Sequence, residues 1–134
     1  MNDSCDVLIT NASLVIPKSG ISFDTNILIE KGKIKKLSKS VRDTNAGKKI
    51  NAKGKFVLPG LIDPHVHYGV YTPIDKAAIT ESRSASIGGV TTIIRMLRLS
   101  HSYRNVESHL QASRGTHHVD YGIHASIFDF GQLA

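Results

Sequence analysis

The stretch 60-GLIDPHVHYG-69 places two histidines two residues apart, at the end of an apolar run that begins at Phe56. On an extended strand, residues i and i+2 point to the same face, so His65 and His67 are expected to project together. Two imidazoles on one face are the start of a divalent-metal site. A His-x-His pair alone is a weak signal, so its interpretation depends on the surrounding segments.

The segments after the histidine pair alternate between predicted strands and predicted helices. After the first strand within 56–69, the pattern predicts a helix at 75–89, a buried strand at 90–97, a helix at 103–114 and a strand at 119–128. This alternation is typical of βαβ units and a parallel sheet. The histidine pair falls at the C-terminal end of the first strand, which is where such folds place their sites.

The segments before the pair predict a small all-β unit over residues 1–57, so we divide the chain into 1–57 and 58–134. Short strands are expected at 6–10, 13–17, 26–30 and 33–37, with two more inside 48–60. The Lys31-Gly32 dipeptide predicts a two-residue hairpin between 26–30 and 33–37.

Composition limits the partners and the compartment. The net charge is +6, but five lysines lie between Lys31 and Lys39 with no aromatic residue among them, which favours a solvated strand face over a nucleic-acid surface. The single cysteine, Cys5, forms no internal disulfide. No signal peptide and no apolar run of about 18 residues is present. We therefore expect a cytoplasmic protein without nucleic-acid or membrane partners.

Two motifs resemble the amidohydrolase superfamily. The family's strand G-K-x-[IV]-x-P-G-x-I-D-x-H-x-H is matched by residues 54–67, and its G-G-V-T-T by residues 88–92. The resemblance implies an α/β fold: the N-terminal part of a (β/α)8 TIM-type barrel, about three strands, preceded by a small β-sandwich portion. It also implies that His65 and His67 are metal ligands, with Asp63 able to orient an imidazole.

The segment 120-DYGIHASI-127 resembles the third strand of hydantoinases and dihydropyrimidinases. Dihydroorotases usually carry an arginine two residues after the second histidine and an asparagine at the end of strand two, where this chain has Gly69 and, approximately, Arg98. The resemblance therefore favours a zinc-dependent hydrolase of cyclic amides, with two divalent metals and a homotetrameric state. A dihydroorotase-like enzyme and a non-catalytic assembly subunit are the alternatives.

Three further residues are candidate substrate contacts. Arg95 stands where the hydantoinase pattern commonly has an acidic residue, and Arg95 and Arg98 can bind an anionic group. The commoner role of such arginines is to pair with carboxylates or to face solvent. Tyr71, in the loop after the first strand, can contact substrate or pack.

The other histidines are assigned no ligand role. Those on or near the second helix are expected to face solvent, and His124 to pack or to form a supporting hydrogen bond. The former are His101, His109, His117 and His118.

The rest of the family's metal site has no counterpart here. The resemblance implies a carboxylated lysine, two later histidines and an aspartate, but the last lysine is Lys76. Two histidines neither fix an open coordination position nor supply a general base. We therefore expect an N-terminal fragment of a longer enzyme, and no hydrolase activity from these 134 residues alone.

Overall fold

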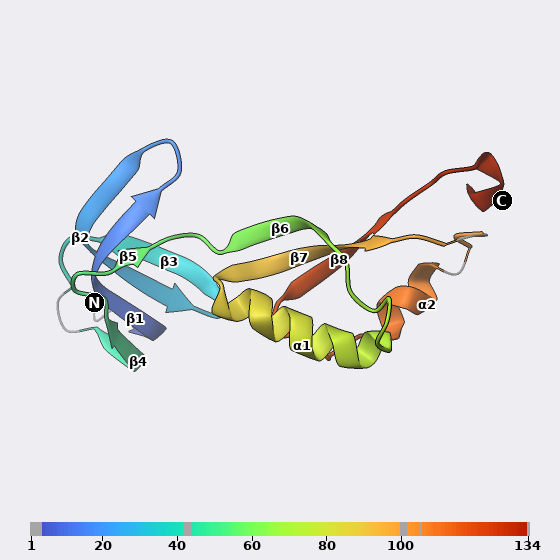
Figure 1. The fold of residues 1–134 in the computed structure, drawn as a ribbon. Helices are drawn as coiled ribbons and strands as arrows, with labels where there is room; N and C mark the ends of the chain where they lie inside the picture. Colours follow the sequence, from blue (N-terminus) through green and yellow to red (C-terminus); the bar gives the residue numbers. More distant parts are fainter. Residues whose placement is uncertain (1–3, 42–43, 100–101, 105, 134) are drawn as a thin grey trace. The chain divides into compact units, whose positions relative to one another are not determined.

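The computed structural model describes residues 4–41, 44–99, 102–104 and 106–133 (Figure 1). The chain divides into two compact units, Met1–Pro59 and Gly60–Ala134. Each unit is built around its own β-sheet, and the two together make a mixed α/β structure.

The first unit contains a five-stranded sheet. Its strands are β1 (Ser4–Ile16), β2 (Gly20–Glu30), β3 (Lys33–Ser38), β4 (Asn45–Asn51) and β5 (Phe56–Val57). The order is β3-β2-β1-β4, and β5 also pairs with β1. Neighbours β1–β2 and β2–β3 are antiparallel, whereas β4 and β5 run parallel to β1. The predicted all-β character of this part of the chain is confirmed.

The predicted hairpin is also confirmed, because Lys31 and Gly32 both have positive φ, 51° and 71°, and join β2 to β3. The prediction of separate strands at 6–10 and 13–17 is wrong. Asn11 adopts a φ of 57°, and the pairing with β2 shifts register on either side of Ala12, so β1 continues through an irregularity. Asparagine tolerates this conformation better than most residues.

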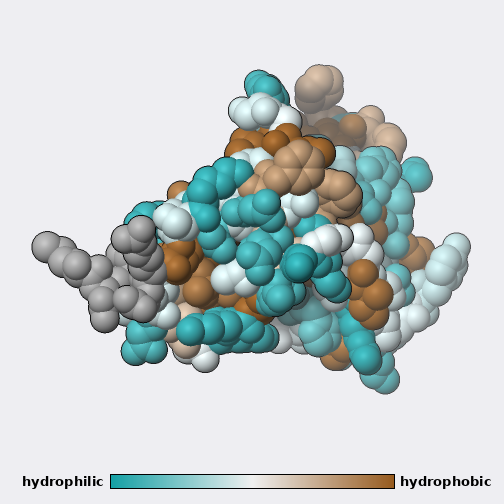
Figure 2. Space-filling view, turned by 90° about the vertical axis from the view of Figure 1, so that its left-hand side faces the viewer, coloured by the Kyte–Doolittle hydropathy of each residue, from teal (hydrophilic) through white to brown (hydrophobic). Residues whose placement is uncertain are grey.

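Lysines lie on both outer strands of the first sheet. Exposed Lys33 and Lys35 are on β3, and exposed Lys48 and Lys49 on β4. Charged edges oppose pairing with another sheet. The apolar residues of β3 are exposed as well, with Ile34 66% and Leu37 46% exposed. Figure 2 looks onto this unit and shows hydrophilic residues between apolar ones.

The second unit contains a three-stranded parallel sheet in the order β6-β7-β8, as predicted. The strands are β6 (Leu61–Val66), β7 (Val90–Leu97) and β8 (Asp120–Ala125). The helices are α1 (Ile74–Ile87), α2 (Val106–Gln111) and a short 3-10 helix, η1 (Phe130–Leu133). Figure 1 shows α1 and α2 on the same side of this sheet. A core of Tyr68, Ala77, Ala78 and Ile93 lies between α1 and the sheet.

The first predicted strand of this unit is less buried than expected. Leu61 and Ile62 on β6 are 55% and 65% exposed, because within the described residues β6 pairs only with β7. Strand β7 is buried as predicted, with Ile93 only 1% exposed.

The second helix is shorter than the predicted 103–114, and β8 ends at Ala125. Tyr103 lies before the helix. Its hydroxyl lies 2.9 Å from the Leu97 carbonyl oxygen and 2.8 Å from that of Ser126. These contacts tie together the chain beyond β7 and β8. Within the described residues, no helix combines the length and apolar character needed to cross a membrane.

Candidate metal centre

The two histidines of the opening motif lie side by side at the C-terminal end of β6. His65 is on the strand and His67 is one residue beyond it. Their Nε2 atoms are 3.1 Å apart, and the ring centroids are 5.0 Å apart in an edge-on arrangement. Both side chains are exposed. The expectation that they project together is confirmed.

This spacing fits a shared divalent ion. At zinc–nitrogen distances of about 2.0–2.1 Å, two imidazole nitrogens of one tetrahedral site lie about 3.3 Å apart. The observed 3.1 Å is close to that value. Among the residues that the structure describes, no group of three or more His, Cys, Asp or Glu is placed to hold a metal. The pair therefore offers two ligands of the three that a catalytic zinc takes from protein.

Asp63 supports the motif through the backbone. Its Oδ1 accepts a hydrogen bond of 3.1 Å from the backbone N–H of His65. The carboxylate thus restrains the backbone of His65, whereas the sequence had suggested that it could orient an imidazole ring. Pro64 lies between the two and fixes φ at its own position. The strand end is thus restrained on its N-terminal side.

Arg95 lies on the opposite side of the sheet from the histidines. On β7 the residues Ile93, Arg95 and Leu97 are buried together, and Ile93 packs in the core beneath α1 with Val66 and Tyr68. His65 precedes Val66 on β6 and so projects to the other face of the strand, and the His67 Nε2 lies 3.1 Å from that of His65.

Arg95 therefore differs from the expectation that it pairs with a carboxylate or faces solvent. It is 9% exposed and, among the described residues, forms no ion pair with a carboxylate; its Nε donates 3.0 Å to the Tyr68 carbonyl. Burial lowers the pKa of Arg95. The side chain is thus held under the helix layer, and its contact with substrate stays a prediction.

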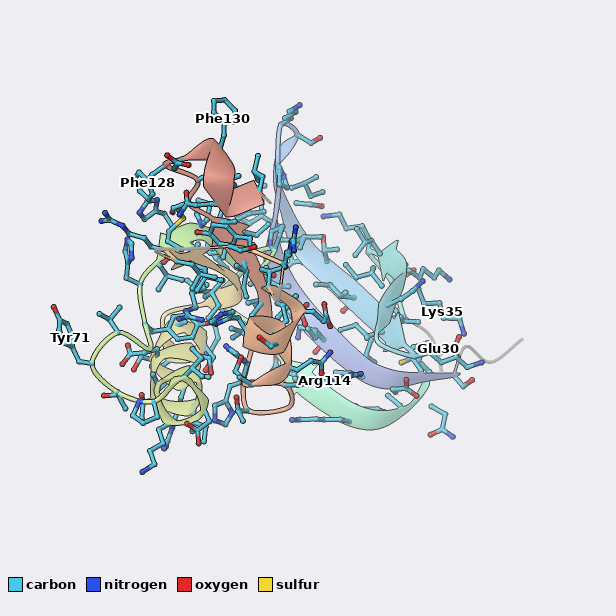
Figure 3. All side chains as sticks on the ribbon, turned by 90° about the vertical axis from the view of Figure 1, so that its right-hand side faces the viewer. Glu30, Lys35, Tyr71, Arg114, Phe128 and Phe130 are labelled. Atoms are coloured by element: carbon cyan, nitrogen blue, oxygen red, sulfur yellow. The ribbon has the colours of Figure 1, made fainter. Side chains whose placement is uncertain are left out.

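Arg98 and Tyr71 are both exposed. The Arg98 guanidinium carbon lies 4.6 Å from the centre of the Phe128 ring. Tyr71 is fully exposed and points outward from the loop between β6 and α1 (Figure 3). That loop and α1 border an open hollow of about 270 Å³ lined in part by His67, Tyr71 and Glu81.

His117 is not the solvent-facing residue expected. Its Nε2 lies 2.7 Å from the Tyr68 hydroxyl, and its ring stacks on Tyr121 with centroids 3.8 Å apart. Burial lowers the pKa of His117 and raises that of Tyr68 to about 12. The alternation of side chains along residues 65–68 indicated that Tyr68 lies on the buried side. No sequence pattern indicated that His117, 49 residues away, is its partner.

The remaining histidines take no part in these contacts. His118 and His124 are exposed and His109 is half-buried, whereas His101 lies outside the described residues. For His124, the expectation of a packed position is wrong, because the outer edge of β8 has no neighbouring strand within the described residues.

Comparison with known proteins gives relatives that hydrolyse cyclic amides. The chain is 38% identical over 100 residues to the L-hydantoinase of Paenarthrobacter aurescens, covering 68% of this chain and 20% of that protein. It is 36% identical over 107 residues to the dihydroorotase of Streptococcus pneumoniae serotype 4, covering 79% of this chain and 25% of that protein. No protein-family model matches.

Solved structures share the fold. The dihydropyrimidinase from Brevibacillus agri superposes with a TM-score of 0.77 at 26% identity, over 91% of this chain and 27% of that one. A more distant fold neighbour, at 23% identity and a TM-score of 0.50, is an N-acyl-D-glutamate deacylase from Bordetella bronchiseptica complexed with zinc, over 69% of this chain and 19% of that one.

The βα unit, its histidine pair and these matches define a homologue of the cyclic-amide hydrolases. Its homologues are hydantoinases, dihydroorotases and dihydropyrimidinases, and its structural neighbours belong to the amidohydrolase superfamily, which confirms the resemblance seen in the sequence. The chain spans a quarter or less of the length of the two curated relatives.

Proposed function

We propose that the complete gene product carrying this chain is a metal-dependent hydrolase that opens a C–N bond of a cyclic amide, in the manner of hydantoinases and dihydropyrimidinases. The observation that carries the proposal is the 3.1 Å approach of the two Nε2 atoms at the end of a parallel strand. The similarity to an L-hydantoinase supports the substrate class.

In this proposal His65 and His67 bind one of two divalent metals, which we propose to be zinc. A zinc ion held there would supply Lewis-acid chemistry, lowering the pKa of a bound water and polarising the amide carbonyl. The zinc-containing fold neighbour supports the choice of metal. Asp63 fixes the backbone of His65, and Tyr71 and Arg98 are proposed to contact the small-molecule substrate.

The wider architecture is also proposed. Strands β6–β8 would be the first three of a (β/α)8 barrel, and residues 1–57 part of a β-sandwich, with 58–134 beginning the barrel. The parallel β6-β7-β8 order and the unpaired edges of β6 and β8 among the described residues support this arrangement. A homotetrameric state and a cytoplasmic location complete the proposal, and light scattering of the purified protein tests the former.

The test compares histidine variants of the complete gene product. We expect bound zinc by elemental analysis and turnover of hydantoin or dihydrouracil, with both lost in His65→Ala and His67→Ala. His118→Ala is the matched control, since its imidazole is exposed and forms none of the contacts described above. Unchanged turnover and zinc content in both His65→Ala and His67→Ala would contradict the proposal. The 134-residue chain alone is expected to be inactive.

Dihydroorotate hydrolysis is the second candidate activity, because a dihydroorotase is among the relatives at 36% identity. The same assay with dihydroorotate separates the two enzymes. Zinc binding without turnover of any of the three substrates would favour the non-catalytic assembly subunit.

A further inference from the structure

A chain of buried polar contacts lies directly behind the histidine pair. Tyr68 follows His67 and is 5% exposed, and it contacts Arg95 through its carbonyl and His117 through its hydroxyl. These groups lie on the helix-facing side of the sheet, opposite the metal motif. Among the described residues, no hydrogen bond joins these side chains to those of His65 or His67.

His67 lies beyond the last residue of β6 that is in register with β7. Val66 is the final β6 residue in register with β7, opposite Arg95. Beyond Val66, no residue of this segment is in register with β7 among the described residues. On the C-terminal side of His67, the backbone is restrained by the burial of the Tyr68 ring and by the bond from Arg95 to the Tyr68 carbonyl oxygen.

The Arg95 contact is specific in geometry. Its Nε donates 3.0 Å to the Tyr68 carbonyl, while its guanidinium carbon lies 5.5 Å from the centre of the Tyr68 ring, so one cation holds both the backbone and the ring. Gly69 passes close by with a φ of +73°, and a Cβ there would lie 3.4 Å from Arg95 Nη2 and 2.7 Å from Ile74 Cδ1. Burying a cation that has no carboxylate partner among the described residues costs free energy. This cost indicates that the position of Arg95 has a structural role.

The His117 contact sets the direction of each hydrogen bond. The Ser113 carbonyl lies 3.3 Å from Nδ1 and can only accept, so Nδ1 carries the proton. Nε2 is then the acceptor for the Tyr68 hydroxyl at 2.7 Å. Stacking on Tyr121, whose hydroxyl donates 3.0 Å to the Leu110 carbonyl, fixes the imidazole plane.

We propose that Arg95 and His117 are positioning residues for His67, acting through Tyr68. Arg95 fixes the backbone after the histidine, and His117 fixes the ring that anchors that backbone in the core. This inference rests on the proposed metal site. It differs from a substrate contact because it places both residues on the face away from the reacting groups.

The test measures metal affinity and geometry rather than activity. In the complete gene product, Zn²⁺ affinity is measured by competition with a chelator, and the Co²⁺ form is examined by its visible absorption spectrum. Tyr68→Phe, Arg95→Met and His117→Phe are expected to weaken Zn²⁺ binding on the order of 10- to 100-fold, the usual cost of losing groups that orient metal ligands. The Co²⁺ spectrum should shift in the same variants.

Two kinds of control separate positioning from folding. Arg83→Met and His118→Phe change exposed residues of the same types and should leave both readouts unchanged. His117→Gln can still accept from the Tyr68 hydroxyl and donate to the Ser113 carbonyl, so it should restore most of the Zn²⁺ affinity. Thermal unfolding of each variant identifies those that are merely unstable.

The possible failures are distinguishable. If His65→Ala weakens Zn²⁺ binding but the variants at Tyr68, Arg95 and His117 lower only the melting temperature, the positioning role is overturned and the metal site stands. If His65→Ala and His67→Ala leave Zn²⁺ binding at the wild-type level, the proposed function fails and the positioning role fails with it.

Discussion

The sheet of β1–β5 and the sheet of β6–β8 differ in how their interiors are made. The first encloses an apolar cluster of Cys5, Leu8 and Leu28. The second has a core of Tyr68, Ala77, Ala78 and Ile93 with Arg95 and His117 bonded to its tyrosine. Apolar side chains need only complementary shape to pack together, whereas hydrogen-bonded polar side chains also fix the direction of each contact. The first sheet also buries hydrogen-bonded polar residues, such as Asn26, whose Nδ2 donates 3.1 Å to the Ser38 carbonyl. In the second unit, the polar contacts centre on the tyrosine that follows the histidine pair.

The largest expected effect comes from removing one core side chain in each unit. Leu28→Ala and Ile93→Ala each empty a position that is 1% exposed, so each should lower the unfolding free energy of its unit by about 2–5 kcal/mol. Only Ile93→Ala should also weaken Zn²⁺ binding. Hydrogen exchange resolved by residue measures the loss of stability in each unit, and competition with a chelator measures Zn²⁺ affinity. Equal loss of Zn²⁺ affinity in the two variants would remove the distinction between the units.

A smaller effect is expected at Ser82, a polar residue buried on α1. Its hydroxyl donates to the Ala78 carbonyl and accepts 2.9 Å from the backbone N–H of His118. Ser82→Ala leaves that N–H without its partner and should cost about 1–3 kcal/mol. Denaturant unfolding compares it with Ser84→Ala, an exposed neighbour. If the two variants are equally stable, the polar contacts of this unit contribute little.

The pH dependence of stability should differ between the units. Burial lowers the pKa of His117 in the folded protein, so the unfolded chain binds its proton first as the pH falls below about 6.5. The contribution of His117 is therefore present above that pH and is lost as the pH falls through the folded-state pKa. Melting curves from pH 8 to pH 5 should show a steeper loss for the wild type than for His117→Gln, with His118→Gln behaving as the wild type. Parallel curves for all three would contradict the assignment.

The smallest effect is expected at the surface of the first unit. Lys35 and Glu30 form an ion pair of 3.1 Å with both side chains 35% exposed, and Figure 3 shows them together. Exposed pairs of this kind contribute about 0–1 kcal/mol and weaken with salt. Lys35→Met should shift the denaturation midpoint slightly at low salt and not at high salt. A salt-independent loss would mean that the Lys35 bond to the Ser4 carbonyl matters more than the charge.

The sequence alone predicted the parts of both units that depend on local pattern. Lys31-Gly32 predicted the hairpin because positive φ at two successive residues suits such a turn. The β-branched run 90–97 predicted β7, and the i, i+2 spacing predicted that His65 and His67 project together. The helix predicted at 103–114 was too long, since α2 spans only Val106–Gln111. Tyr103 lies before the helix, and its hydroxyl contacts the carbonyl oxygens of Leu97 and Ser126, which no local helical pattern predicts.

Tertiary structure decided what lies behind the histidine pair. Arg95 has no local feature that separates a substrate contact from a buried anchor, because that depends on which side of β7 the helices cover. The pairing of His117 with Tyr68 joins residues 49 positions apart, so it forms only when packing brings them together. The sequence determined that two imidazoles meet at a strand end. The folded chain alone determined which groups hold that strand end, because contacts between distant residues exist only after α1, β7 and β8 have packed together.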